Sequence, residues 1–398
     1  KANDLPAAVL AAGSSVGHQV GPAVAATGDG KIRAGWAVGY KSPIALYERT
    51  FDSTGKPLDV QPRQLSATSE GPLRLVATAN NGWLAAWLEP EVQLGTGTLL
   101  ARHLRLQSFD AADQPGSVQE LAVLGPGQPY SGLATAAAAM PGVGAAVLLA
   151  TGTTDTADTA DIVRLACVDA GGSKVGLAVV ADAPAKARRG LELRVMQAGD
   201  GSRSYWALWS ESSAKSYSAK GEDIWLRTFD ASCTPLGPAA VLVAGVDSGA
   251  TSIQMSAPVL AGSQLGSAAL VWNRREEAAV KGYTLQMAPL DAKGTLGPAT
   301  TIDGPWSFEV VSHALLNSNG GLTVALTGLG LGGGTKVATA ANLTSGLTRY
   351  MLGKSQYKIA LASLPNGVPV LMYAMGTATP FPGKTDSSDV YIQILPAP

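Results

Sequence analysis

The chain has 398 residues, of which 46% are hydrophobic and 15% are charged, so it can bury a large core and lacks the composition of a disordered protein. Its 47 glycines and 24 prolines, together with many Ala, Thr, Ser and Val residues, disfavour a helical protein. The formal net charge of −1 provides no positive field for nucleic acid or an anionic membrane, so those partners are disfavoured.

The N-terminus is the first feature along the chain. Residue 1 is Lys, and no basic and apolar leader precedes the predicted fold. Either a signal peptide has been removed or the sequence has been trimmed, and removal of a signal peptide agrees with an exported protein. We therefore expect a secreted protein, either extracellular or periplasmic.

Five similar segments follow at regular distances. Each is an alternating strand that ends in an apolar residue and Asp, followed by a turn with Gly or Pro: residues 46–59, 104–117, 163–176, 224–237 and 285–298. Their apolar anchors are Phe51, Phe109, Val168, Phe229 and Leu290, spaced by 58, 59, 61 and 61 residues. Two weaker copies at Leu343 and Leu395 make seven. Because Asp bonds its own backbone and Gly allows positive φ, each segment predicts two strands joined by a tight turn.

A second turn precedes most anchors. Segments of Asn-Gly or Asp-Gly type, which favour β-hairpins, occupy residues 27–31, 80–83, 198–202, 317–321 and 364–368. One repeat thus has four antiparallel strands, here called a to d in chain order. Seven such repeats predict an all-β fold, a seven-bladed β-propeller with four-stranded antiparallel blades. A pair of β-sandwiches is the alternative, but it gives no reason for seven copies.

The predicted propeller is a single domain over residues 1–398. We expect its blades at residues 21–66, 72–125, 131–183, 190–245, 253–304, 306–357, and 358–398 together with 4–13.

One apolar stretch, residues 133–150, is long enough to cross a membrane. Pro141, Gly142 and Gly144 at its centre argue against a span. We interpret it as two strands joined by a turn at residues 140–142, and we expect no transmembrane segment.

The two ends of the chain complement each other. The last repeat stops after its third strand, and "LPAAVLAAG" at residues 5–13 resembles "PLGPAAVLVAG", the fourth strand of the fourth repeat at residues 235–245. The N-terminal segment is therefore expected to supply the outer strand of the last blade and so close the ring.

The copy "EDIWLRTFDASCTPLG" at residues 222–237 carries a resemblance to a known group. It is similar to bacterial exported propellers with repeats of the form D-[IV]-[YW]-x-x-x-F-D-x-x-G-x-x-L-G, and "SDVYIQIL" at residues 388–395 matches the first half of that form. The resemblance implies a propeller and an exported location. It implies no reaction, because the group shares a structural repeat and not an activity.

A candidate ligand-binding face lies at the b–c loops, which are long and irregular, whereas the a–b and c–d connections on the opposite face are short. Aromatic residues are predicted to end strand b there, at Tyr40, Trp87, Trp209, Trp272 and Tyr373, with charged neighbours Glu89, Glu211, Arg274 and Arg275. One interpretation is a ring of aromatic platforms that stack on sugars or grip a peptide. The preferred alternative is that these aromatics pack one blade against the next, as Trp36, Trp83 and Trp206 are expected to do.

Metal and cofactor chemistry has little support. Asp155, Asp158 and Asp161 occupy one loop at steps of three residues and could contribute to a Ca²⁺ site, but they lack the spacing of a known calcium loop. A solvated loop is the preferred interpretation, and no cofactor is expected. The three histidines have no His or Cys partner at ligand spacing, which disfavours zinc.

The two cysteines are Cys167 and Cys233, in the third and fourth repeats. They are predicted near the same end of adjacent blades. Two alternatives therefore remain, a disulfide between them or two free thiols. Their 66-residue separation excludes a C-x-x-C redox motif.

No catalytic motif is present, although a propeller enzyme can assemble its residues from several blades. The leading hypothesis is a non-enzymatic exported propeller that binds a protein or glycan partner through the b–c loops. A polysaccharide lyase or hydrolase that uses Glu89, Glu211, Glu276 and Arg274 is the first alternative. A structural subunit of an extracellular assembly, packed through its outer strands, is the second.

Overall fold

The computed structural model describes residues 7–12, 19–39, 44–70, 73–124, 135–151, 162–181, 187–212, 222–245, 253–262, 268–276, 283–306, 309–317, 320–328, 335–342, 347–353, 356–376 and 388–396. Within these residues the chain forms 28 β-strands and one short 3-10 helix, η1 (Ala79–Asn81). None of the described helices is long and apolar enough to cross a membrane.

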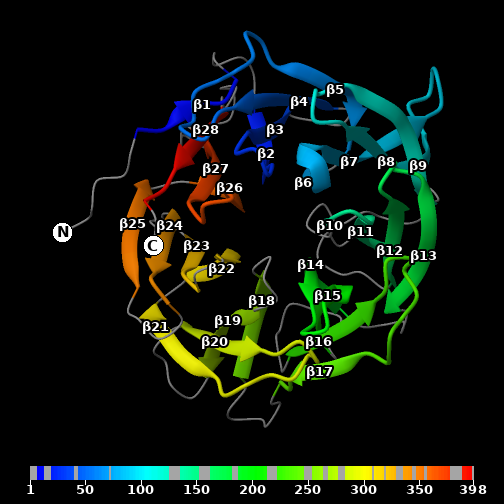
Figure 1. Ribbon diagram of the computed structural model, residues 1–398. Coiled ribbons are helices and arrows are strands. Elements are labelled where there is room, and N and C mark those ends of the chain that lie inside the picture. Colours follow the sequence, from blue (N-terminus) through cyan, green and yellow to red (C-terminus); the bar gives the residue numbers. More distant parts are fainter. Residues whose placement is uncertain are drawn as a thin grey trace. The chain divides into compact units, whose positions relative to one another are not determined.

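The strands form seven four-stranded antiparallel sheets, the blades of a seven-bladed β-propeller, which confirms the predicted fold class (Figure 1). Blade 1 contains β2 (Gln19–Ala26), β3 (Ile32–Val38), β4 (Ile44–Phe51) and β5 (Arg63–Ser69), and blade 2 contains β6 (Arg74–Ala77), β7 (Trp83–Val92), β8 (Leu99–Phe109) and β9 (Pro115–Leu124). Blade 3 contains β10 (Thr135–Met140), β11 (Gly144–Thr151), β12 (Ile162–Asp169) and β13 (Lys174–Ala181), and blade 4 contains β14 (Ala187–Gln197), β15 (Arg203–Ser212), β16 (Glu222–Phe229) and β17 (Ala240–Val243).

The last three blades follow the same order. Blade 5 contains β18 (Ile253–Gly262), β19 (Ala268–Glu276), β20 (Tyr283–Leu290) and β21 (Thr300–Trp306), and blade 6 contains β22 (Glu309–Leu316), β23 (Leu322–Gly328), β24 (Thr335–Ala340) and β25 (Thr348–Gly353). Blade 7 contains β26 (Gln356–Ser363), β27 (Pro369–Gly376), β28 (Ser388–Ile394) and β1 (Val9–Leu10). The apolar stretch at residues 133–150 is the hairpin of β10 and β11, as predicted.

The chain divides into two compact units. The first comprises residues 1–126, 332–337 and 349–398 and holds blades 7, 1 and 2. The second comprises residues 127–331 and 338–348 and holds blades 3, 4 and 5 with β22 and β23.

The N-terminal segment completes blade 7, as the sequence predicts. β1 pairs with β28 through Val9–Ile392 and Leu10–Tyr391, and the Ala11 N–H donates to the Val390 carbonyl at 2.8 Å. The buried Arg49 of β4 donates to the Ala11 carbonyl at 3.3 Å, so blade 1 also holds this strand. Figure 1 shows β1 beside β28, the two ends of the chain in one sheet.

The repeated Asp of the strand c turns has one role in five blades. Its Oδ1 accepts backbone N–H groups two and four residues later, as Asp52, Asp110, Asp169, Asp230 and Asp291 all do. These bonds build the turn and leave its fourth residue in the left-handed region. Glycine fills that position in three blades, as Gly55, Gly172 and Gly294.

Two blades replace this glycine with Asp113 (φ 63°) and Cys233 (φ 66°). A left-handed residue other than glycine costs about 1 kcal/mol. Each exception bonds the preceding blade: Asp113 pairs with Arg33 at 2.8 Å, and Cys233 forms a disulfide with Cys167 across a Cα–Cα distance of 5.7 Å. The sequence left the pairing of the cysteines open; in the structure they form a disulfide, which links blade 4 covalently to blade 3.

The a–b hairpins differ in detail from the Asn-Gly and Asp-Gly turns expected from the sequence. In four of them the glycine ends a three-residue loop with positive φ, at Gly30, Gly201, Gly320 and Gly367. Three-residue loops with a left-handed residue are the second common way to join strands in a hairpin. In the sixth blade, β24 ends at Ala340, before the predicted anchor Leu343, which lies outside the described residues.

Reduction of the Cys167–Cys233 disulfide is expected to lower the thermal midpoint. The bond closes a loop of 66 residues, and removing such a constraint costs about 4 kcal/mol in the chain-entropy account. The measurement is thermal unfolding with and without reductant. The variant Cys167→Ala/Cys233→Gly should recover part of the loss relative to Cys167→Ala/Cys233→Ala, because glycine relieves the positive φ at position 233. Equal midpoints for oxidised and reduced protein would contradict this role.

Candidate functional site

The predicted aromatic residues occupy one equivalent position in the blades. Strand b pairs them with the strand c residue that lies four positions before the anchor: Trp36 with Tyr47, Trp87 with Arg105, Trp209 with Trp225, Trp272 with Gln286 and Tyr373 with Tyr391. In blade 1 this position belongs to Trp36. Tyr40, which the sequence placed in the series, lies outside the described residues.

These aromatics are buried. Trp87, Trp209, Trp272 and Tyr373 expose 3%, 1%, 3% and 5% of their surface. Trp87 packs in the core shared by blades 1 and 2, and Trp209 in the core shared by blades 3 and 4, where it stacks on Trp225. Burial, with Tyr391 close by, raises the pKa of Tyr373 to about 12. Rings packed in this way offer no face to a sugar, so their burial favours the preferred interpretation, packing between blades, over exposed platforms.

The other predicted site residues are scattered. Glu211 is buried in β15, and Arg274 is half-buried in β19. Arg275 and Glu276 belong to β19, but their side chains are not described. Asp155, Asp158 and Asp161 lie outside the described residues, so their role in Ca²⁺ binding stays a prediction. Among the described residues no group of three or more His, Cys, Asp or Glu side chains has the geometry to hold a metal ion.

Glu89 is different, because it belongs to a charged network on blade 2. Its carboxylate accepts from Arg105 Nε at 3.0 Å and from the Thr68 hydroxyl of β5 at 3.0 Å. Arg105 also donates from Nη1 to Glu120 at 3.1 Å. Glu120 lies 2.7 Å from Nδ1 of His103, and His103 Nε2 lies 3.1 Å from Glu91. We call these five residues, Glu89, Glu91, His103, Arg105 and Glu120, the blade 2 network.

Strand alternation places the network on one face of the sheet. Glu89 lies opposite His103, and Arg105 lies opposite Glu120, so their side chains point the same way. Further along the strand, Trp87 on this same face is covered by blade 1. Glu89 still contacts β5 of blade 1, whereas Glu91 and Glu120 are exposed. Val118 and Val123 of β9 share the face and expose 47% and 50% of their surface.

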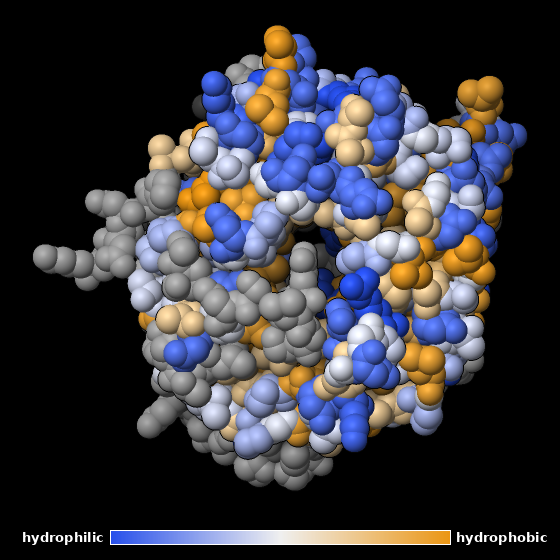
Figure 2. Space-filling model, viewed as in Figure 1, coloured by the Kyte–Doolittle hydropathy of each residue, from blue (hydrophilic) through white to orange (hydrophobic). Residues whose placement is uncertain are grey.

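The network has an excess of negative charge. Three carboxylates face one permanent cation, Arg105, and the outer two, Glu91 and Glu120, expose 53% and 41% of their side chains. A protonated His103 donates to both of its carboxylates, whereas a neutral ring donates to one. The surface of blades 1 and 2 that faces the viewer in Figure 2 is largely hydrophilic, with separate apolar residues among the polar ones.

Sequence reasoning selected Glu89 and missed His103, Arg105 and Glu120. The segment "ARHLRLQSF" does show polar residues at alternate positions 103, 105 and 107, the signal of a strand with one polar face. This segment does not show how its strand pairs with its neighbours, and that pairing brings residues 89, 105 and 120 together.

Comparison with solved structures gives the fold alone. The chain is similar to a protein of unknown function from Dyadobacter fermentans, with 10% identity, 99% of each chain covered and a TM-score of 0.53. It is also similar to a PL25 ulvan lyase bound to -[GlcA(1-4)Rha3S]-, with 8% identity, 98% and 96% coverage and a TM-score of 0.58. For the polysaccharide lyase Uly1 the identity is 12%, the coverage 97% and 91%, and the TM-score 0.55. No protein-family model matches, and no curated protein matches in sequence.

Trp87→Ala is expected to destabilise the protein rather than to remove a binding contact. Emptying a buried tryptophan site costs about 3–5 kcal/mol, because the lost packing is only partly recovered by relaxation. Thermal unfolding measures the effect, with Leu94→Ala as the control, since Leu94 is 96% exposed and its removal should leave the midpoint unchanged. An unchanged midpoint for Trp87→Ala would show that the ring is not part of the core.

Proposed function

We propose that this chain is an exported, non-catalytic binding propeller that uses the blade 2 network to hold a basic segment of a partner protein. The observation that carries the proposal is the exposed pair of carboxylates, Glu91 and Glu120, on a network with three acids and one arginine. Exposed Val118 and Val123 beside them add apolar surface. A lysine- or arginine-bearing segment complements both features.

The choice of a protein over a glycan rests on two facts. Sugar binding by stacking needs accessible aromatic faces, and the four predicted aromatics that the structure describes, Trp87, Trp209, Trp272 and Tyr373, are buried. An acidic polysaccharide would also meet like charge at this surface. A basic protein segment needs no exposed aromatic face, and its charge is opposite to that of this surface.

Export is supported by the Cys167–Cys233 disulfide, since such bonds persist in oxidising compartments. Both cysteines of the chain are used in this bond. The location is therefore proposed to be extracellular or periplasmic.

The test is binding of fluorescent poly-L-lysine, measured by anisotropy at low and physiological salt, with poly-L-glutamate as the opposite-charge control. Glu91→Gln/Glu120→Gln should weaken binding of poly-L-lysine about tenfold, since two exposed charge contacts contribute about 1.4 kcal/mol together. Glu192→Gln, which removes one carboxylate from blade 4, is the matched control and should leave the affinity unchanged. Equal affinity of the double variant and the wild type would exclude the blade 2 network as the site.

A polysaccharide lyase is the second candidate, favoured by His103. Its imidazole contacts two carboxylates and lies in a network with Arg105, and a lyase needs a base and a cation beside the uronate carboxylate. Solved structures with this fold include polysaccharide lyases. The binding proposal is preferred because Arg105 is already paired with Glu89 and Glu120.

The lyase candidate is tested by incubating the protein with uronic-acid polysaccharides and following the ultraviolet absorbance of the unsaturated product. We expect no product. Formation of product that is lost in His103→Ala would replace the binding proposal with a lyase at the same residues.

A further inference from the structure

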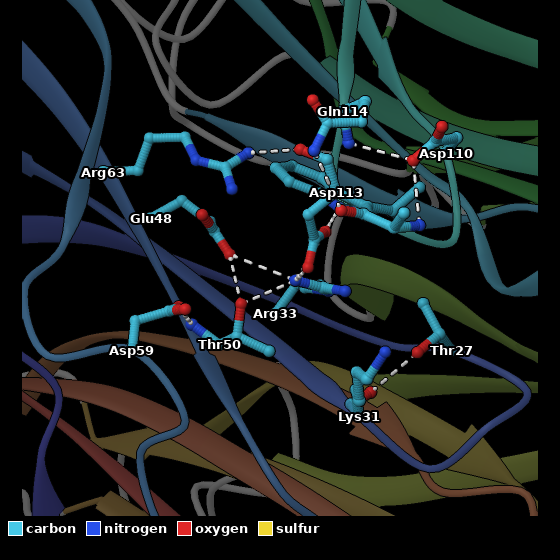
Figure 3. Close-up of polar contacts among 12 residues, drawn as sticks. Thr27, Lys31, Arg33, Glu48, Thr50, Asp59, Arg63, Asp110, Asp113 and Gln114 are labelled. Atoms are coloured by element: carbon cyan, nitrogen blue, oxygen red, sulfur yellow. Dashed lines mark hydrogen bonds and ion pairs between the residues drawn. The ribbon is translucent and has the colours of Figure 1, made fainter.

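A second charged cluster is buried between blades 1 and 2 (Figure 3). Arg33 of β3 is completely buried, and its Nη1 donates to the Thr50 hydroxyl at 2.6 Å and to Asp113 at 2.8 Å. The Thr50 hydroxyl donates in turn to Glu48 Oε1 at 3.2 Å. Asp113 comes from the turn between β8 and β9, so this cluster connects the two blades.

Asp113 is the well-satisfied carboxylate of the cluster. Besides Arg33, it accepts from the Trp83 indole N–H at 2.8 Å, and its side chain is 24% exposed. It also occupies the left-handed turn position that other blades give to glycine. The geometry of the turn therefore aims its charge at Arg33.

Glu48 is the poorly satisfied one. Its side chain is 1% exposed, its Oε1 lies 3.8 Å from Arg33 Nη1, and its Oε2 has no hydrogen-bond partner among the described residues. An ionised carboxylate is costly to bury without full pairing. Arg33 is thus paired with Asp113 at 2.8 Å and has a second acid, Glu48, beside it at the longer distance of 3.8 Å.

The charged groups around Glu48 come from several elements. Arg33 on β3 and Arg63 on β5 favour its ionised form, whereas Asp59 and Asp113 oppose it. Burial is the largest effect, and it raises the pKa of Glu48 from its usual value of 4.5 to about 7. Burial and the two nearby acids therefore outweigh the two arginines.

We propose that Glu48 keeps its proton in the folded protein up to neutral pH, and that its ionisation at higher pH weakens the Arg33–Asp113 contact that ties blade 2 to blade 1. With Glu48 neutral, the buried cluster holds one cation and one anion. With Glu48 ionised, two carboxylates compete for Arg33. The proposal concerns the seam between the blades and is independent of the binding function.

The sign of the pH effect follows from the two protonation states. The folded pKa lies above the unfolded one, so the stability that protonated Glu48 contributes is complete below pH 4.5 and is lost as the pH rises through about 7. Glu48→Gln mimics the neutral acid at every pH.

The experiment compares thermal midpoints of the wild type and Glu48→Gln from pH 5 to pH 8.5. We expect a difference between the two midpoints that is small at pH 5 and grows with pH, with the higher midpoint for Glu48→Gln at pH 8.5. Parallel pH profiles, or a variant that is less stable throughout, would overturn the proposal. Glu70→Gln, at an acid that pairs with Arg102 near the surface, is the control and should keep the wild-type profile.

A second measurement needs no variant. Infrared difference spectra of the folded wild type between pH 6 and pH 8.5 should show a protonated carboxyl C=O stretch that disappears with rising pH. Its absence at pH 6 would overturn the proposal, even if Glu48→Gln failed to fold.

Discussion

The structure depends on the burial of sheet faces against neighbouring sheets. A four-stranded blade has two apolar faces and cannot cover either of them alone, so each blade is stable only through the seams it shares. Trp36, Trp87, Trp209 and Trp272 occupy one equivalent position of strand b, and each is almost completely buried. Large rings at this position explain why the residues that looked like a binding ring are components of the core.

The residues that depart from the repeat also lie at contacts between neighbouring blades. Five Asp turns share one hydrogen-bond pattern, and three of them place glycine in the left-handed position. Asp113 and Cys233 depart from glycine, and both make a bond to the preceding blade. The strain of a left-handed side chain is offset by an ion pair in one case and by a covalent bond in the other. The repeat is thus modified where two blades are tied together.

The two charged clusters of blades 1 and 2 show how burial decides what charge can do. The blade 2 network exposes Glu91 and Glu120 to solvent, so its excess negative charge is available to a partner. In the cluster of Arg33, Glu48 and Asp113, Arg33 and Glu48 are buried, and burial raises the pKa of Glu48. The two proposals, a binding role at the surface and a pH response between the blades, differ because water solvates the first group of residues and not the second.

The sequence by itself determined the architecture of this protein. The spacing of the anchors Phe51 to Leu290 and the turn residues predict four strands per repeat and seven repeats, and the match between residues 5–13 and 235–245 predicts the strand that completes blade 7. These features are local or periodic, and local hydrogen bonding and alternation produce them. Tertiary structure alone decided which side of each strand is buried, and hence that Trp87 belongs to the core while Glu89, two residues later, joins His103, Arg105 and Glu120. These four residues, Glu89 included, come from three strands. Their contact depends on strand register and on the cover that the neighbouring blade provides, and neither can be read from the linear sequence.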